Sequence, residues 1–453
     1  MVDHSLRGSR RSDAPLDAIR SAAHRLAGNA SDYDGLLQLI GNARFALIGE
    51  ASHGTHEFYS ERVEITKRLI LEKRCTAIAV EGDWPDAYRV NRYIRGASTD
   101  ADADAALSGF KRFPTWMWRN TVVRDFVEWL RRYNEGQARD QQVGFYGIDL
   151  YSLFGSIDAV LTYLDKVDPE AARRARYRYS CFDHYGEDTQ AYGYAASFGM
   201  SKTCEDAVVS QLTDILRSAG QYVGRDGRME TDEFFFAEQN ARLVKNAEEY
   251  YRTMFRGHVS SWNLRDQHMV ETLQALDRYL SRADAPARIA VWAHNSHLGD
   301  ARATEMGDAG ELNVGQLMRE HYGDDAVLIG FTTHRGTVTA ASDWGAPVER
   351  KRVRPALEGS YETLLHDTGF ERFLLALRGD EALQRALQGP RLERAIGVIY
   401  LPETERVSHY FDCRLTQQFD AVIHLDVTTA LEPLERGAQW MGEEAPETYP
   451  SGM

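Results

Sequence analysis

The chain has 453 residues, enough for two or three domains or for one large α/β domain with an insertion. Its formal charge of −15 opposes non-specific binding to nucleic acid or to an anionic membrane, because both partners need a basic surface. No apolar run approaches the length of about eighteen residues that a membrane span requires. The first twelve residues lack the apolar stretch of a secretory signal and read as a disordered lead-in.

The number and spacing of the cysteines indicate whether the chain is built for an oxidising or a reducing cellular compartment. The four cysteines are scattered and include no Cys-x-x-Cys pair. Neither a disulfide framework nor a structural zinc site is therefore expected, and a cytoplasmic location is the default. The positions are Cys75, Cys181, Cys204 and Cys413.

The predicted elements alternate between strand and helix in the first third of the chain, which is the βαβ rhythm of a parallel sheet. A helical segment is predicted near 15–29, strands at 44–49, 76–81 and 142–148, and helices at 57–73, from Pro85 and at 118–135. Long polar stretches with helical periodicity follow at 205–219, 232–256 and 264–282. Strands return at 288–293, 326–331, 337–341, 372–377, 395–400 and 420–425.

This order predicts an α/β fold with a mainly parallel central sheet flanked by helices and an inserted helical lobe. The expected parts are a lead-in and helix at 1–30, an α/β catalytic domain in two segments at 31–151 and 286–435, the helical lobe at 152–285, and a tail at 436–453 that is loose from residue 443.

Three predicted strands run into loops that carry acids and histidines. The loops contain Glu50 and His53 after the first strand, Glu81, Asp83 and Trp84 after the second, and His294 and His297 after the third. The carboxyl ends of parallel strands meet at one edge of a sheet, so these side chains are expected to converge there. Carboxylates and histidines together indicate a general acid/base site.

His53 is the best candidate for a general base, because a neutral imidazole with a pKa near about 6.5 takes a proton from water. Glu50, three residues earlier, is placed to hold the ring in one tautomer. Burying a glutamate at the end of a strand costs free energy unless its carboxylate is paired or has a function, which favours a role for Glu81. His294 lies nearer its strand than His297 and is the first choice as second catalytic histidine, but the sequence leaves the two open.

Other side chains are candidates for ligand contact. Asp83 and Asp149 end their strands, and Trp84 is either a pocket wall or part of the core. Arg265 and His268 open a long helix, where arginine presents a fixed fork of donors to oxygen atoms or pairs with Asp266. The basic run 349–354 reads as a solvated face, although in so acidic a chain it is also placed to contact an anionic ligand.

Several familiar motifs are absent from the sequence. It has no Gly-x-Ser-x-Gly elbow, no Walker A loop and no dinucleotide glycine fingerprint, which disfavours a serine hydrolase, a kinase and a nicotinamide enzyme. His56 and Glu57 complete a His-x-x-His-Glu string that matches neither zinc-helix pattern, so both read as structural.

Four motifs resemble the erythromycin esterase family: Ile48-Gly-Glu-Ala-Ser-His-Gly-Thr-His-Glu-Phe, Val80-Glu-Gly-Asp-Trp-Pro-Asp, Asn263-Leu-Arg-Asp-Gln-His-Met and Val291-Trp-Ala-His-Asn-Ser-His. Thr337 to Trp344 and Ser408 to Phe411 are similar to its commoner bacterial branch, some of whose members are named for succinoglycan biosynthesis.

The resemblance implies a cleft between sheet domain and helical lobe, and hydrolysis of a macrolide lactone by water without a covalent acyl-enzyme. By motif position, the base would be His53, its acidic partners Glu50 and Glu81, the later histidine His294, and the arginine of the lobe Arg265.

The sequence is thus interpreted as a hydrolase of a small-molecule ester or lactone, with no nucleic-acid or membrane partner, no required cofactor and an open oligomeric state. Two alternatives remain. His53, His294, Glu50 and Glu81 are also the ligand types of a metal-dependent hydrolase. The second alternative is a binding or accessory protein that keeps the fold but has lost turnover.

Overall fold

The computed structural model describes residues 14–185, 188–200, 202–223, 228–255, 257–282 and 285–437. The predicted lead-in before residue 13 and the predicted loose tail from residue 443 lie outside this range. Within it, no helix is long and apolar enough to cross a membrane.

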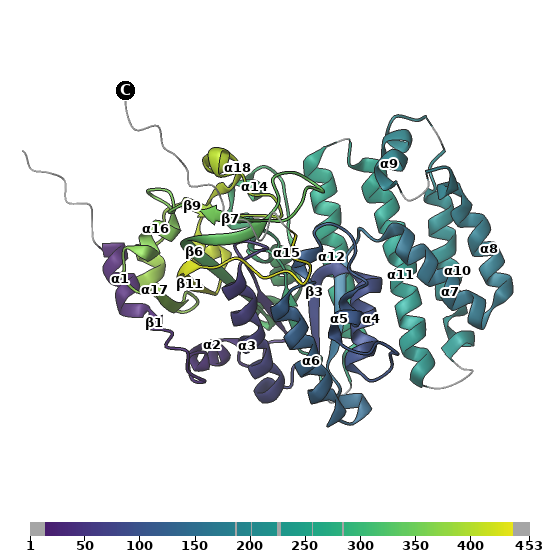
Figure 1. Ribbon diagram of the computed structural model, residues 1–453, viewed down its shortest axis with the longest axis horizontal. Coiled ribbons are helices and arrows are strands. Elements are labelled where there is room, and N and C mark those ends of the chain that lie inside the picture. Colours follow the sequence, from purple (N-terminus) through teal and green to yellow (C-terminus); the bar gives the residue numbers. More distant parts are fainter. Residues whose placement is uncertain are drawn as a thin grey trace, which may run out of the picture.

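A largely parallel sheet forms the centre of the fold (Figure 1). Its strands are β1 (His24–Arg25), β2 (Phe45–Ile48), β3 (Ala77–Asp83), β4 (Gly144–Asp149), β5 (Ile289–Trp292), β6 (Ala326–Ala340), β7 (Glu349–Val353), β8 (Arg372–Ala376) and β11 (Ala421–Thr428). Their order is β1-β8-β11-β6-β2-β5-β3-β4, with β7 paired to the far half of β6. The five pairings from β11 to β4 are parallel, and those of β1, β7 and β8 are antiparallel. β9 (Arg391–Arg394) and β10 (Tyr410–Cys413) form a separate ribbon.

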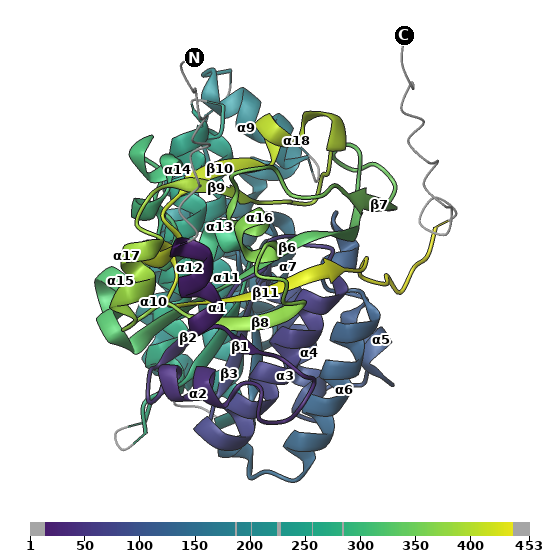
Figure 2. The ribbon, with the colours of Figure 1, turned by 90° about the vertical axis from the view of Figure 1, so that its left-hand side faces the viewer.

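The central strands are apolar up to their carboxyl-terminal residues because helices cover both faces of the sheet. Alternate residues serve opposite layers: Phe45 and Leu47 belong to one core, Ala46 and Ile48 to the other. The first core is shared with α7 (Leu153–Val167) and α12 (His258–Leu280), the second with α3 (His56–Lys73) and α6 (Thr121–Glu135). Figure 2 shows α3 and α6 together below β11 and β8.

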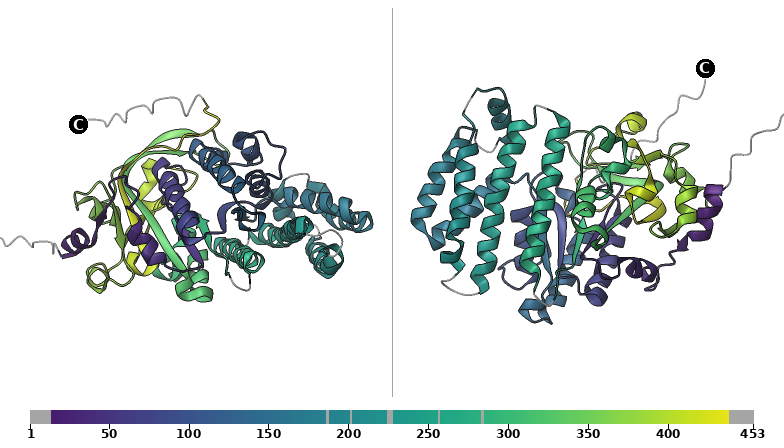
Figure 3. Two further views of the ribbon diagram at one scale, coloured as in Figure 1. Left: turned by 90° about the horizontal axis from the view of Figure 1, so that it is seen from below. Right: turned by 180° about the vertical axis from the view of Figure 1, so that it is seen from behind.

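Six helices form a group beside the β4 edge of the sheet. The blue-to-teal helices of this group lie together at one end of the molecule in both views of Figure 3. The group consists of α7, α8 (Pro169–Tyr179), α9 (Thr189–Ser197), α10 (Glu205–Val223), α11 (Arg228–Thr253) and α12. The other helices of six residues or more are α1 (Ala14–Ala22), α2 (Asp34–Ile40), α4 (Trp84–Ile94), α15 (Val314–Tyr322), α16 (Tyr361–His366) and α17 (Glu381–Ala386). The predicted α/β class with a mainly parallel sheet is confirmed.

The structure corrects one expectation about cysteines. Cys181 and Cys204 form a disulfide within the helical group, whereas Cys75 and Cys413 are free and buried. The sequence argument for the cytoplasm rests on unpaired cysteines, so this bond weakens that argument, because disulfides persist mainly in oxidising compartments.

Three predicted elements also differ. The helix predicted over 15–29 ends at Ala22, and a short strand, β1, follows. The strand predicted over 395–400 is wrong: this apolar segment is extended but pairs only through isolated bridges of Ile396 to Ser52 and of Ile399 to Ala341. The basic run 349–354 is largely strand β7, and the predicted strands 326–331 and 337–341 are the two ends of β6.

Candidate active site

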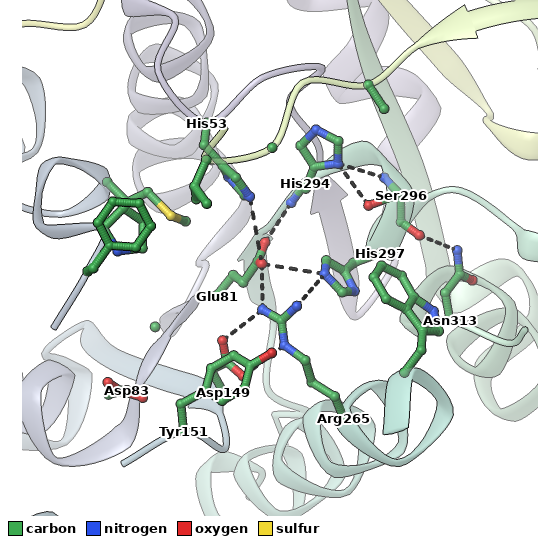
Figure 4. Close-up of a pocket in the computed structure, with 18 of the residues that line it drawn as sticks. His53, Glu81, Asp83, Asp149, Tyr151, Arg265, His294, Ser296, His297 and Asn313 are labelled. Carbon is green, nitrogen blue, oxygen red and sulfur yellow. Dashed lines mark hydrogen bonds and ion pairs between the residues drawn. The ribbon is translucent and has the colours of Figure 1, made fainter. Parts of the chain in front are cut away.

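A cavity of about 460 Å³ opens at the carboxyl ends of β2, β5, β3 and β4. These strands are neighbours in that order and run parallel, so the loops that follow them meet above one edge of the sheet. The polar residues that line the cavity include His53, Glu81, Asp83, Asp86, Arg112, Asp149, Tyr151, Arg265, His294, Ser296, His297 and Asn313. Figure 4 shows how most of these side chains point toward one another.

His53 follows β2 and is held by a chain of charges behind it. Its Nδ1 lies 2.9 Å from Glu50 Oε1, and Arg62 Nη2 donates to the other carboxylate oxygen of Glu50 at 2.7 Å. Arg62 is fully buried between the rings of Tyr59 and Trp292. Because Nδ1 donates to the carboxylate, the neutral ring presents the lone pair of Nε2, which lies 3.9 Å from Glu81 Oε1.

Glu81 sits where the register between β3 and β4 shifts, between Val80 and Asp83. Such an irregularity re-aims a side chain next to a site. Its Oε1 accepts from Arg265 Nη2 at 2.7 Å, and Oε2 accepts from the backbone N–H of His294 at 2.9 Å. Burial alone would raise the pKa of this carboxyl, but neighbouring positive charge outweighs burial and holds it well below its usual range.

Arg265 reaches from α12 to the sheet edge. Its Nε and Nη2 donate to both oxygens of Asp149 at 3.0 and 2.8 Å, and Nη1 lies 3.0 Å from His297 Nε2. The guanidinium also lies over the Tyr151 ring, 4.9 Å from its centroid. Although burial works against the charged form of Asp149, the guanidinium lowers its pKa below the ordinary value. Arg265 therefore joins the helical group to the carboxylates of two strands.

His297 is held in place from three sides. Its Nδ1 lies 2.9 Å from Asp266 Oδ1, its ring stacks on Trp262 with centroids 4.5 Å apart, and its Nε2 lies 3.4 Å from Glu81 Oε1. Burial disfavours the imidazolium, but the negative charges of Asp266 and Glu81 are stronger and raise the pKa of His297 to about 9. Asp266 and Glu81 therefore favour the charged ring, whereas the Arg265 guanidinium, whose Nη1 lies 3.0 Å from His297 Nε2, opposes it.

His294, in contrast, has a pKa below the ordinary value, and its ring is neutral. Its Nδ1 accepts from the backbone N–H of Ser296 at 3.2 Å, so the proton of the neutral ring is on Nε2. That atom is buried and has no partner within ordinary hydrogen-bond distance in the described part of the chain, although a weaker contact with the Ala51 backbone favours the charged ring. Burial, and then the nearby His53, lower the pKa of His294 to about 3. The two imidazole centroids are 4.9 Å apart.

The outer part of the cavity combines one ion pair with aromatic walls. Arg112 donates to both oxygens of Asp83, at 3.0 and 3.3 Å, and lies over Tyr151 with its guanidinium carbon 4.6 Å from the ring centroid. Aromatic side chains from three segments complete the lining: Phe110, Phe113, Trp118, Trp262 and Trp344. A mostly apolar cavity with a few convergent polar groups is the usual form of a small-molecule site.

Three predicted site residues stand apart from the cavity lining among the residues described. Glu50 lies behind His53 and acts through it. Trp84 is core: it stacks on Tyr146 and its Nε1 donates to a backbone oxygen of α11. His268 is buried against Asn246, 2.9 Å from its Nδ2, and burial lowers the pKa of its ring to about 4. The other seven predicted residues line the cavity together.

The start of helix α3, which follows His53, makes its contacts within the chain. The backbone N–H of His56 donates to Thr429 at 2.8 Å, and the described residues of the first turn of α3 do not line the cavity. The backbone N–H and the hydroxyl of Thr429 donate to the two carboxylate oxygens of Glu57. This helix terminus is therefore occupied by the chain itself.

Sequence reasoning misses Arg62, Arg112 and the role of Asp266. Arg62 lies within a predicted helix, where a buried arginine has the same pattern as a solvated one. Asp266 follows Arg265 directly, and adjacency suggests an ion pair between them; instead the two side chains serve different partners. The run of aromatic residues around Arg112 is the one signal that could have indicated a ligand wall.

The carboxylates offered by the sequence as metal ligands are already paired with cations. Glu50 binds Arg62, and Glu81 binds Arg265. In the described ranges, no group of three or more His, Cys, Asp or Glu side chains is arranged to hold a metal ion. A cation beside Arg265 would also be repelled at close range. This donor set does not fit a metal.

Comparisons with known proteins agree with this fold. The family model described as erythromycin esterase matches residues 70–428, a range that contains Glu81, Arg265 and His294 but begins after His53. Erythromycin esterase type II of Escherichia coli is 22% identical over 433 residues, which is 89% of this chain and 94% of that protein.

Three solved structures share the fold. A Bacillus cereus protein superposes with a TM-score of 0.79 at 18% identity, covering 94% of this chain and 100% of that one. A succinoglycan biosynthesis protein gives 0.73 at 21% identity, with 94% and 99% covered. A mutant of the erythromycin esterase EreC in its open conformation gives 0.64 at 17%, with 88% and 94% covered. Since the family model spans most of the sequence, the chain belongs to the erythromycin esterase family.

Proposed function

We propose that this protein hydrolyses a carboxylic ester or lactone by direct attack of water, with His53 as general base and Glu50, Glu81 and His294 as its catalytic partners. The observation that carries the proposal is the geometry of His53. One ring nitrogen is bound to a buried carboxylate, and the other is directed toward Glu81 at the cavity. This arrangement is that of an oriented general base.

The first step takes one proton from water. His53 Nε2 accepts that proton while the water oxygen forms a bond to the carbonyl carbon, and the carbonyl π electrons move to its oxygen. Glu50 stabilises the resulting imidazolium, and Arg62 keeps Glu50 in place. When the tetrahedral intermediate collapses, the C–O bond breaks and the leaving alkoxide takes a proton. No acyl-enzyme forms.

Charge developing on the carbonyl oxygen needs a donor. We assign this role to the neutral ring of His294, which carries its proton on Nε2 and whose centroid lies 4.9 Å from that of His53. The proton that the alkoxide takes is the one that His53 accepted from water, so the base is neutral again after each turnover; His297 lies beside Glu81, with its Nε2 3.4 Å from Oε1. Arg265 has the role of fixing Glu81 and Asp149, with Asp83 and its partner Arg112 lining the approach.

The relatives named for erythromycin hydrolysis make macrolide lactones the first substrates to examine. Hydrolysis of a panel of macrolides and simple esters should be lost in His53→Ala. The matched control is His56→Ala, which removes a histidine from the same motif whose ring faces Ser60, 3.2 Å from its hydroxyl. Chelator should leave turnover unchanged.

Full activity in His53→Ala would refute the general-base role. Turnover abolished by chelator and restored by a divalent ion would favour the metal-dependent alternative. Tight binding of a panel member without any turnover would favour a binding or accessory protein.

A further inference from the structure

A second concave surface lies on the extended part of the sheet. It has a volume of about 460 Å³ and is formed by the far half of β6, by β7 and by the end of β11. Figure 2 shows these strands side by side, and Figure 1 places them on the opposite side of the molecule from α8 and α10. Among described residues it shares no lining residue with the catalytic cavity. We refer to it as the β7 groove.

Three arginines line the β7 groove: Arg335, Arg350 and Arg352. In the antiparallel pairing of β6 with β7, Arg352 lies opposite Thr337. Since side chains alternate along a strand, Arg350 shares a face with Arg352, and Arg335 shares that face from β6. Arg350 and Arg352 lie roughly 7 Å apart, the two-residue repeat of a strand, and Arg335 lies diagonally across from Arg352 on the neighbouring strand.

The residues between them show that the pattern is built by the fold. Lys351, between the two arginines of β7, points to the other face, where it is buried and donates to Ser342 Oγ at 2.6 Å and to the backbone oxygen of Tyr400 at 3.1 Å. Val353 is buried as well. β7 therefore fixes which cations face the groove.

The charge of the β7 groove contrasts with that of the whole chain. Of the described residues that line it, three are basic and none is acidic, in a chain of net charge −15. The adjacent carboxylate of Glu57 is bound to Thr429. A concave surface focuses the potential of like charges and attracts counter-ions. Arginine also offers the fork geometry that matches oxyanions.

We propose that the β7 groove binds a small, multiply charged oxyanion ligand, with phosphate or carboxylate groups bound by Arg335, Arg350 and Arg352. Val427, which is 55% exposed, gives the groove an apolar side for the ligand's carbon skeleton. Arg350 and Arg352 also make contacts within the chain, so the ligand competes with these contacts. The site is independent of the proposed hydrolytic activity.

Binding of inorganic tripolyphosphate and of citrate to the full chain, measured by calorimetry, tests the proposal. The variant Arg335→Gln/Arg350→Gln/Arg352→Gln should bind the preferred probe at least tenfold more weakly. The control Arg173→Gln/Arg176→Gln/Arg385→Gln changes net charge equally at exposed arginines elsewhere and should change affinity less than twofold.

The probe that binds more tightly identifies the ligand's charged group: phosphate if it is tripolyphosphate, carboxylate if it is citrate. Binding should also weaken steeply with salt, because the contacts are ionic and exposed. Equal weakening in both triple variants would show that only net charge attracts the anion and would overturn the proposal. The proposal would also be overturned if neither tripolyphosphate nor citrate bound. Hydrolysis assays play no part in either outcome.

Discussion

Replacing Asp266 by Asn should discharge His297 while leaving its surroundings in place. The amide has the size of the carboxylate and keeps an oxygen to accept the Val314 N–H, which now donates to Asp266 Oδ1 at 3.0 Å. It lacks the negative charge that, with Glu81, raises the pKa of His297 to about 9. Burial, which lowers that pKa, is unchanged. The pKa of His297 should therefore fall below the ordinary value of about 6.5.

The size of the effect follows from the shift. A rise from about 6.5 to about 9 corresponds to about 3 kcal/mol of preference for the charged ring in the folded state. Since the folded pKa lies above the unfolded one, this stabilisation is fully present below about pH 6.5 and disappears as the pH rises through 9. The free energy of unfolding of Asp266→Asn should thus be lower than wild type at pH 6 by at most about 3 kcal/mol, because Asn also removes the cost of burying the Asp266 carboxylate, whose pKa burial raises; the difference should decrease as the pH rises through about 9.

Two measurements check this prediction. NMR titration of the imidazole Cε1–H signals, with His297 assigned from a His297→Gln variant, gives the pKa directly. Urea unfolding at pH 6 and pH 9 gives the stability difference. Asp412→Asn, at an exposed position on β10, is the matched control. A His297 pKa that is unchanged in Asp266→Asn would refute the reasoning that this carboxylate sets the charge of the ring.

Three further changes have defined outcomes. Arg62→Met leaves the buried Glu50 carboxylate without its cation. This variant should lose about 3–5 kcal/mol of free energy of unfolding and most of its hydrolytic activity. Wild-type stability in urea would contradict this. Gly54→Ala places a Cβ 1.8 Å from a backbone oxygen of β6, so kcat should fall as His53 is displaced, together with about 1–3 kcal/mol of stability; an unshifted crystal structure would contradict it. His268, with a pKa of about 4, must stay neutral in the fold, so stability should decrease as the pH falls from 6.5 through 4, and His268→Gln should flatten this decrease in acid unfolding curves.

The strand-end pattern predicted much of the cavity because its cause is local. A parallel strand covered on both faces is uniformly apolar, so an acid or a histidine at its end stands out, as Glu81 and His294 do. Topology then brings these ends together. The predicted edge is correct even though about 240 positions separate His53 and His294.

What the sequence could not supply depends on tertiary contacts. The segment 395–400 has the apolar pattern of a strand, but whether it pairs depends on the loops around Ser52 and Ala341. Trp84 lies next to a cavity residue in the chain and still faces the core, because α4 begins there and turns the side chain away. The disulfide of the helical group joins cysteines 23 positions apart, a spacing that indicates no pairing by itself.

The position of β5 has a consequence for how the chain reaches its native state. β5 lies between β2 and β3, so the first two long strands to be synthesised are not neighbours in the finished sheet. From the end of β3 to the start of β5, 206 residues must be made (289 − 83), which takes roughly 10–40 s at about 5–20 residues per second. During that time the edges of β2 and β3 lack the strand that separates them. Chaperone binding to nascent chains should therefore peak before residue 289 emerges.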